Sequence, residues 1–387
     1  MKTPLACLNL IHYKVRTAVA VAGVSFAVAL MFMQLGFREA VKISATLIYD
    51  VLNFDICIRS SDYLHLGDAR SFPKSRLFRV EGVAGVKRVC PFQAGLALWR
   101  HPRPEIGEKR GILVLGLRPA DDVLLDPAMR ETARRFLTTP DKVLIDTTTR
   151  PEFGPRAGRQ FGSQDVGVVS EIGNQAIRIA ECFTRGAGLT ASGAVLVEER
   201  GFSRIVPGSS PSQVTFGLVT IDEGQNANAV AQRLRAALPS DVEVLTRAET
   251  LQGEVNRWLW DTNYGLIFTA GVVVAVIVGI AIVYQVLTSE VTSLLPEYAT
   301  LRAMGYRNGY LAGVVLQQAS ILGAVGFVPG LIVSLLMYAV TEWLAGIPIR
   351  MTNANFWLVF ALSLSMCVFS GLLAMRKTFE ADPADLY

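Results

Sequence analysis

The segment LLPEYATLRAMGYRNGYL, residues Leu294–Leu311, lies between two long apolar runs. The run before it, Thr262–Ser289, contains no charged residue, and neither does the run after it, Asn308–Thr341. An uncharged apolar run of this length can cross a hydrocarbon layer of about 30 Å as a helix. The segment is therefore predicted to connect two membrane-spanning helices.

The same segment has the signals of a short amphipathic helix. Pro296 suits the first turn of a helix, where its missing N–H has no intrahelical partner, and Glu297 lies where the helix dipole favours an anion. Tyr298 and Leu301 share one helical face, and Gly305 is a typical helix end. We expect a short helix held between two spans. The alternative is an exposed helical loop without a specific role.

The composition is that of a membrane protein with a large polar part. Of 387 residues, 51% are hydrophobic, which is too apolar for an ordinary soluble enzyme, and the net charge of +4 is too small to indicate nucleic-acid binding. Three of the five cysteines, Cys57, Cys90 and Cys182, lie in the polar part. Their spacing predicts neither a disulfide framework nor a zinc site. One disulfide and buried free thiols both stay open.

Four runs are predicted to span the membrane, namely residues 17–37, 263–288, 309–340 and 356–375. The first is read as an uncleaved span, because its apolar core is long and no small-residue cleavage site follows. The third contains Pro329, which predicts a kink. Gly326 and Gly330 lie four residues apart and allow another helix to approach closely, either as plain packing or at a dimer interface.

A polar domain is predicted between the first and second spans. Residues 54–92 and 214–246 each read as strand–helix–strand, and two such units can pair into one split βαβ lobe. Residues 93–213 are then an inserted β-rich lobe with short apolar runs punctuated by Gly and Pro. The expected strands of this lobe are Gly95–Trp99, Gly111–Leu117, Lys142–Asp146 and Ala194–Val197.

Helices are expected at both ends of the polar domain. Residues 38–53 continue the first span without Pro or Gly, and residues 247–262 carry one apolar stripe. The stripe consists of Leu251, Val255, Trp258 and Leu259. Side by side, the two helices would form a stalk. The alternative is that both are ordinary amphipathic helices packed on the domain.

The charges of the short segments predict the orientation. Lys and Arg accumulate on the cytoplasmic side. They are frequent in residues 1–16, 289–308 and 376–387, whereas residues 341–355 hold only Arg350. We therefore expect both termini in the cytoplasm, with a tail over residues 376–387. Residues 1–16 are read either as an amphipathic helix on the membrane surface or as a frayed tail. The polar domain and the loop 341–355 are then extracytoplasmic.

Catalytic motifs are absent from the sequence. No Gly-Lys dipeptide occurs, so a phosphate-binding loop of the GxxxxGK type is excluded, and there is neither HExxH nor GxSxG. The three histidines are scattered and predict no metal site. Asp121, Asp122 and Asp126 form the nearest approach to a carboxylate cluster and are more typical of turn or helix caps. No catalytic residue and no cofactor are predicted in this chain.

Several stretches resemble the ABC permeases of the FtsX/MacB type, which act by mechanotransmission, and most closely the DevC-type exporter permeases of cyanobacteria. Those stretches are MFMQLGFREA (31–40), RGILVLGLRP (110–119), TRPEFGP (149–155), EIGN (171–174), EYATLRAMGYRNGYL (297–311) and the terminal ADPADLY. They span nearly the whole chain. Members of this family commonly end in Phe where this chain has Tyr387.

The resemblance implies a fold and a function. The fold would be an α-helical membrane domain of four helices with a large α+β extracytoplasmic domain, whose split βαβ lobe is porter-like. A separate ATPase, which binds ATP and Mg, would dock on the cytoplasmic helix within residues 289–308. The residues implied in this coupling are Pro296, Glu297, Tyr298, Leu301, Arg302, Gly305 and Tyr306.

The resemblance also implies partners and a location. The permease would be a homodimer in the inner membrane of a Gram-negative-type bacterium and would bind a periplasmic membrane-fusion adaptor that leads to a TolC-like channel. The cargo would be a lipid, a glycolipid or another amphiphile. The alternative is a non-transporting relay that regulates a periplasmic enzyme, as in the FtsX branch.

Overall fold

The computed structural model describes residues 14–103, 107–155, 160–184, 188, 191–261, 263–293, 304, 308–345 and 349–380. Two compact units make up the chain. One consists of Met1–Ala40 with Thr262–Tyr387 and is called the membrane unit, and the other, Val41–Asp261, is called the polar unit.

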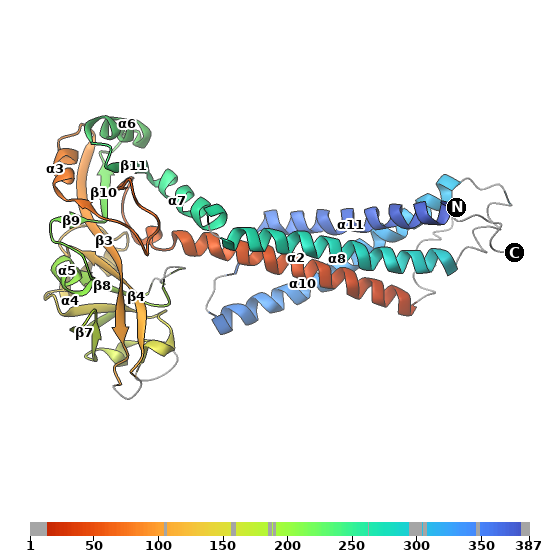
Figure 1. Ribbon diagram of the computed structural model, residues 1–387, viewed down its shortest axis with the longest axis horizontal. Helices are drawn as coiled ribbons and strands as arrows, with labels where there is room; N and C mark the ends of the chain where they lie inside the picture. The colour runs from red at the N-terminus through yellow and green to blue at the C-terminus, as the bar shows by residue number, and fades with distance from the viewer. Residues whose placement is uncertain are drawn as a thin grey trace. The chain divides into compact units, whose positions relative to one another are not determined.

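The membrane unit is built from four long helices (Figure 1). They are α2 (Lys14–Thr46), α8 (Asn263–Ser293), α10 (Asn308–Ala345) and α11 (Asn353–Glu380). Among the described residues, four helices are long and apolar enough to cross a membrane. Helix α11 packs on both α8 and α10. The spanning stretches of the four helices are apolar all round, as expected for helices surrounded by lipid and by one another. The chain is therefore a multi-pass membrane protein.

Glycines in α10 bring that helix close to α2 within the same chain. A Cβ on Gly326 would lie 2.6 Å from the Cβ of Val24, and one on Gly330 would lie 2.8 Å from the carbonyl oxygen of Ser25. Ser25 also donates a hydrogen bond to the carbonyl of Gly326 at 2.9 Å. In the structure, this glycine pair therefore serves close helix packing within the chain.

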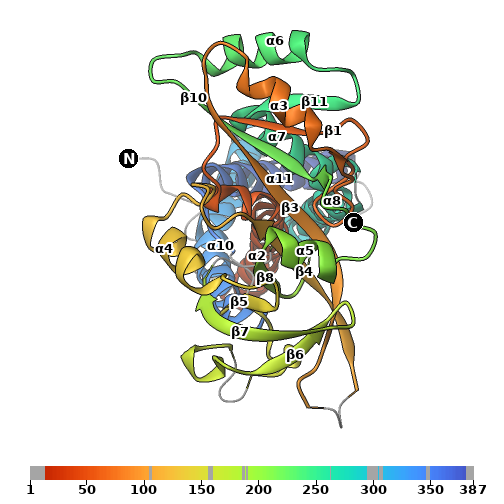
Figure 2. The same ribbon diagram turned by 90° about the vertical axis from the view of Figure 1, so that its left-hand side faces the viewer.

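The polar unit contains two strand–helix–strand motifs whose four strands pair antiparallel in one sheet. They are β1 (Ile56–Ser60), α3 (Ser75–Glu81), β3 (Val86–Arg100) and then β10 (Phe216–Ile221), α6 (Ala227–Ala237), β11 (Val242–Thr246). The strand order is β11-β1-β10-β3. Helices α3 and α6 contact each other, and Figure 2 shows them near β1, β10 and β11. Their Leu77, Val80 and Leu234 are buried in one cluster with Ile56 and Ile58 of β1. These elements are called the split lobe.

The remaining strands of the polar unit extend the sheet beyond β3, and the last of them pairs with β3 again. They are β4 (Lys109–Leu117), β5 (Lys142–Asp146), β6 (Val169–Ile172), β7 (Gln175–Phe183) and β8 (Ala194–Glu198), with helices α4 (Pro127–Phe136) and α5 (Glu199–Ile205). The order after β3 is β4-β8-β5-β7-β6, and β6 also pairs with β3. These six strands therefore form a closed ring, called the ring lobe.

An apolar cluster belongs to the ring lobe itself. It contains Trp99, Phe153 and Phe161, and the Trp99 indole donates to the carbonyl of Phe153 at 2.9 Å. The short pair β2 (Phe72–Pro73) and β9 (Gln213–Val214) and the 3₁₀ turns η2 (Pro151–Phe153) and η3 (Ser163–Asp165) complete the unit.

The structure differs from the sequence expectations at two boundaries. The helix expected over residues 38–53 ends at Thr46, because Tyr49 and Leu52 beyond it enter the core of the polar unit as a 3₁₀ turn, η1 (Tyr49–Val51). The expected boundary between residues 92 and 93 falls inside β3, which runs unbroken from Val86 to Arg100 and changes its partner from β10 to β4 at this point. One strand is therefore shared by both lobes.

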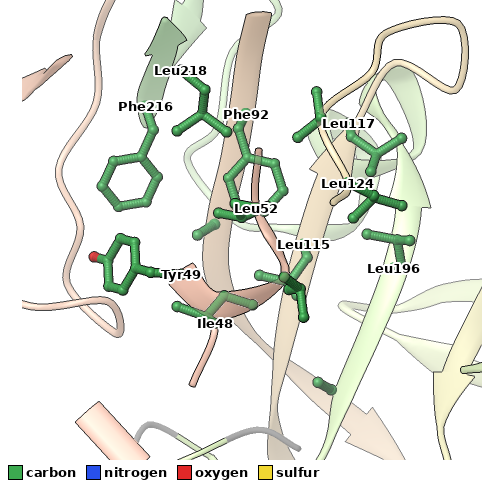
Figure 3. Close-up of a cluster of buried hydrophobic side chains, with 14 of the residues drawn as sticks. Ile48, Tyr49, Leu52, Phe92, Leu115, Leu117, Leu124, Leu196, Phe216 and Leu218 are labelled. Atoms are coloured by element: carbon green, nitrogen blue, oxygen red, sulfur yellow. The ribbon is translucent and has the colours of Figure 1, made fainter. Parts of the chain in front are cut away.

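The largest core cluster of the polar unit also joins the two lobes. It contains Phe216 and Leu218 of the split lobe together with Leu115 and Leu196 of the ring lobe. Figure 3 shows Tyr49 and Leu52 among these side chains. Burying such side chains contributes roughly 1.5–3 kcal/mol each. The turn that follows α2 is thus part of the core and is not a loose linker.

Candidate functional site

Both ends of the polar unit meet at one place, next to the core just described. The first is residues 47–55, which follow α2 and are called the connector segment. The second is α7 (Arg247–Asn256), which follows β11 directly and continues into the π-helical turn η4 (Arg257–Asp261). A capping box starts α7, because the Thr246 hydroxyl accepts from the Glu249 N–H while Glu249 accepts from the Thr246 N–H.

Arg247, the first residue of α7, holds the connector segment. Its guanidinium donates to the carbonyl of Tyr49 at 2.8 Å and to that of Leu52 at 2.9 Å. Its backbone N–H donates to the carbonyl of Asp55 at 2.8 Å, and the guanidinium lies 4.6 Å from the centre of the Phe54 ring. Charged donors to backbone carbonyls are among the stronger hydrogen bonds in proteins.

A buried ion pair fixes the middle of α7 to the central strand β1. Arg59 donates from Nη1 to Glu254 at 3.1 Å and from Nε to Glu243 at 2.9 Å. The Glu254 side chain is only 1% exposed. The Arg59 guanidinium also lies 4.3 Å from the centre of the Tyr63 ring. We call Tyr49, Arg59, Tyr63, Arg247 and Glu254 the connector joint.

The electrostatics of the connector joint follow from its burial. Burial raises the pKa of Glu254, and hydrogen bonding from Tyr63 and the charge of Arg59 only partly counter this. Burial also raises the pKa of Tyr49 and of Tyr63, whose hydroxyls lie 3.2 Å apart. Both tyrosines are therefore neutral at physiological pH. They supply the polar surroundings that the ion pair needs in place of water.

The connector segment also binds the ring lobe. The Asn53 N–H donates to the carbonyl of Val123 at 2.7 Å, and the Leu125 N–H donates to the carbonyl of Val51 at 2.8 Å. The Asn53 side chain donates to the carbonyl of Asp122 at 3.4 Å. A displacement of the connector segment would therefore act on α7, on β1 and on the ring lobe together. The arrangement is suited to transmitting force.

The structure places the predicted stalk residues on the polar unit. Leu251 packs against the main core cluster, and Leu259 is buried. Val255 is half-buried, and the ring of Trp258 lies 6.1 Å from that of His65. Helix α7 therefore packs on the domain, as in the alternative reading of this stripe. A stalk role of these residues stays a prediction.

The predicted ATPase-coupling residues lie outside the described part of the chain. They are Pro296, Glu297, Tyr298, Leu301, Arg302, Gly305 and Tyr306. Their role stays a prediction as well.

The aspartates and cysteines singled out in the sequence form a helix cap, ion pairs and free thiols. Asp126 caps α4 by accepting from the Ala128 N–H, and Asp122 pairs with arginines. Among the described cysteines, Cys57, Cys90 and Cys182 carry free thiols. Burial raises the pKa of Cys57 to about 12, so this thiol stays protonated and inert. Within the described residues, no group of three or more His, Cys, Asp or Glu could hold a metal ion.

Sequence reasoning missed Arg59, Arg247 and Glu254. Two signals could have found Arg59 and Glu254. Glu254 is a carboxylate next to the apolar stripe of its helix, and Arg59 is a charge within an otherwise apolar strand. A buried charge of this kind requires a partner, and each is the partner of the other.

Comparisons with known proteins find a family similarity in the C-terminal part of the chain. Residues 266–383 match the family model described as FtsX-like permease C-terminal. No curated protein matches the sequence significantly. The matched residues contain α10, α11 and most of α8, together with the segment between α8 and α10.

Solved structures resemble the chain only distantly. The extracellular domain of the noncanonic ABC-type transporter YknZ from Gram-positive bacteria has 14% identity and a TM-score of 0.34, covering 50% of this chain and 100% of that one. The periplasmic region of MacB from Actinobacillus actinomycetemcomitans has 10% identity and a TM-score of 0.34, covering 53% and 94%. With TM-scores below 0.5, the assignment depends on the family model. What the comparisons show is therefore a similarity of residues 266–383 of this membrane protein to the FtsX-like permease C-terminal family.

Proposed function

We propose that this chain is the permease subunit of an ABC exporter and that it transmits motion from a separate ATPase to its own polar unit. The observation that carries the proposal is the family match over residues 266–383, which includes the segment between α8 and α10. The sequence lacks the GxxxxGK loop. In this scheme the fuel, ATP with Mg, is bound by the partner subunit.

The connector joint supports a mechanical role. The chain passes between its two units through α2 and again after Asp261. Near both passages, charged side chains bind the entering and leaving segments to one core. In the proposed mechanism, ATP-driven motion of the spanning helices enters at residues 41–55 and 247–261 and moves the polar unit as one body.

The finer assignment is a DevC-type tripartite exporter of the inner membrane. Its partners are a second copy of the chain, the ATPase, a periplasmic membrane-fusion adaptor and, through the adaptor, a TolC-like channel. Its cargo is a lipid, a glycolipid or a related amphiphile. Both termini and residues 289–308 lie in the cytoplasm in this proposal. It is supported by the motif resemblance and by the positively charged short segments.

The coupling role is tested by placing charges on the apolar face of the segment between α8 and α10. Tyr298→Asp with Leu301→Asp should abolish co-purification of the ATPase, because an apolar contact would receive unpaired charges. Phe78→Asp is the matched control, since Phe78 is 72% exposed on α3 of the polar unit. Retention of the ATPase by the double variant would show that the coupling role is wrong.

A second measurement separates export from the relay alternative. Affinity purification of the full chain from its native membrane should recover an adaptor and an outer-membrane channel together with the ATPase. Recovery of a cell-wall hydrolase in place of the adaptor would favour the relay.

A further inference from the structure

Three arginines converge on one carboxylate where the two lobes meet. Arg88 of β3 lies 2.7 Å from Asp122, with its Nη1 on Oδ2. Arg134 Nη2 lies 2.9 Å and Arg130 Nη1 lies 3.3 Å from the other oxygen, Oδ1. We call Arg88, Arg130 and Arg134 the arginine triad. Asp122 neutralises one of its three charges.

The charges around the triad do not neutralise its two remaining positive charges. Asp121 faces Arg118, Arg88, Glu199 and Lys74, and Glu199 pairs with both Lys74 and Arg118. The whole cluster thus contains five cationic side chains and three carboxylates, which leaves two positive charges. Burial raises the pKa of Asp121, and the charges of Arg118 and Arg88 act in the opposite direction.

The triad has more donors than Asp122 can use. Arg130 and Arg134 lie one turn apart on α4, where like charges repel each other. The side chains of Arg88 and Arg134 are 37% and 44% exposed, so a ligand can reach them.

We propose that the arginine triad binds a phosphate-class oxyanion. A guanidinium presents paired N–H donors in a plane that matches the oxygens of phosphate. A phosphate monoester carries about −1.5 to −2 charges at pH 7, which matches the two positive charges that the cluster leaves uncompensated. The ligand is held by ion pairs and hydrogen bonds, and no covalent bond changes.

Occupancy of the triad would reach the connector segment. The carbonyl of Asp122 accepts from the Asn53 side chain, and that of Val123 accepts from the Asn53 N–H. An anion on the triad competes with Asp122 for the same guanidinium donors. Its binding therefore changes the contacts beside the segment through which, in the proposed function, motion enters the polar unit. This consequence rests on the proposed function, whereas anion binding does not. The triad would then report an anionic cargo to the transport machinery.

Binding is tested by calorimetric titration of the full chain in detergent with inorganic phosphate, at an ionic strength held constant with chloride. One saturable site is expected. Arg130→Gln with Arg134→Gln should weaken it at least tenfold, because both donors and two charges are lost. Arg135→Gln removes a charge from the same helix outside the triad and is the matched control. Absence of a saturable site, or equal weakening in the control, would overturn the proposal.

Two further measurements complete the test. One separates loss of binding from misfolding, and the other identifies the source of the anion. Arg88→Lys keeps the charge but loses the planar fork, and it should weaken phosphate binding while the unfolding midpoint stays within a few degrees of the wild type. Nanodiscs with phosphatidate should compete with phosphate if the ligand is a lipid headgroup. Absence of competition at an intact site assigns a soluble phosphate ester. Neither measurement requires the ATPase. The anion-binding result can therefore be interpreted even if the chain is not part of an exporter.

Discussion

At the scale of single residues, Arg247 is the side chain with most influence on the connector joint. Arg247→Ala leaves the carbonyls of Tyr49 and Leu52 without their donor. A lost hydrogen bond of this kind costs about 1–3 kcal/mol. We expect amide hydrogen exchange to accelerate in residues 49–55 and 247–256. Arg233→Ala on the exposed face of α6 is the control, and protection of both segments at the wild-type level would contradict the assigned role.

Glu254 predicts a pH dependence with a definite sign. Its pKa is raised in the folded state above the ordinary value of 4.5. The stabilisation linked to its proton is thus fully present below pH 4.5 and is lost as the pH rises through the folded pKa. As the pH is raised from 4.5 to 7, the unfolding temperature of the wild type should therefore fall relative to that of Glu254→Gln, which has no titrating carboxyl group.

Glu254→Ala should behave differently from the glutamine variant. It leaves Arg59 buried with only the partly exposed Glu243 as a partner, and breaking a buried pair costs about 3–5 kcal/mol. An unfolding midpoint of the alanine variant equal to that of the wild type would show that the pair contributes nothing at this position.

Asp122 predicts the opposite slope. The hydrogen bond from Arg88 and the charges of Arg88 and Arg130 lower its pKa below the ordinary value of 3.8. Its contribution to stability is therefore present above pH 3.8 and is lost as the pH falls through the folded pKa. The advantage of the wild type over Asp122→Asn should shrink between pH 4 and pH 2. A constant difference over this range would contradict the pairing.

At the scale of elements, the contact between α10 and α2 depends on two glycines. Gly326→Ala with Gly330→Ala places methyl groups 2.6–2.8 Å from atoms of α2. Overpacking of this kind costs about 1–3 kcal/mol. Gly309→Ala, on the same helix with open space around it, is the matched control. Labelling of the buried Cys367 during heating, in a variant in which the other cysteines are replaced by alanine, measures the expected fall in the unfolding temperature of the membrane unit.

The elements also show how much the sequence could predict. The four apolar helices are predictable because their runs need no tertiary context. The strand β7 was missed although Ile177 and Ile179 alternate with the exposed Arg178, a period-two signal hidden by the polar residues around it. The continuity of β3 could not be read from the sequence, since Pro91 and Gly95 within it resemble strand ends.

The candidate site was less predictable than the fold. Arg59 and Glu254 are 195 residues apart, and only the paired strands β1 and β11 bring their elements together. The 3₁₀ turn at Tyr49 has no helix-breaking residue to mark it. It forms because tertiary burial of Tyr49 and Leu52 outweighs continuation of the helix.

At the scale of the whole molecule, the orientation in the membrane can be measured directly. In a variant with all five cysteines replaced by alanine, Glu223→Cys in the polar unit should react with a membrane-impermeant maleimide added to spheroplasts. Met304→Cys, between α8 and α10, should react only after the membrane is permeabilised. Both positions are exposed, so access to the reagent decides the outcome. The reverse pattern would place the coupling segment on the wrong side for a cytoplasmic ATPase.

The strand common to both lobes restricts how such a protein can be recombined with its relatives. A chimera joined at residue 93 would divide β3 between two parents, since residues 86–92 pair with β10 and residues 93–100 pair with β4. It would also mix the two parents in the core cluster that joins the lobes. A viable graft has to carry residues 41–261 intact. Gene exchange and protein engineering are therefore expected to treat the two lobes as a single inherited module.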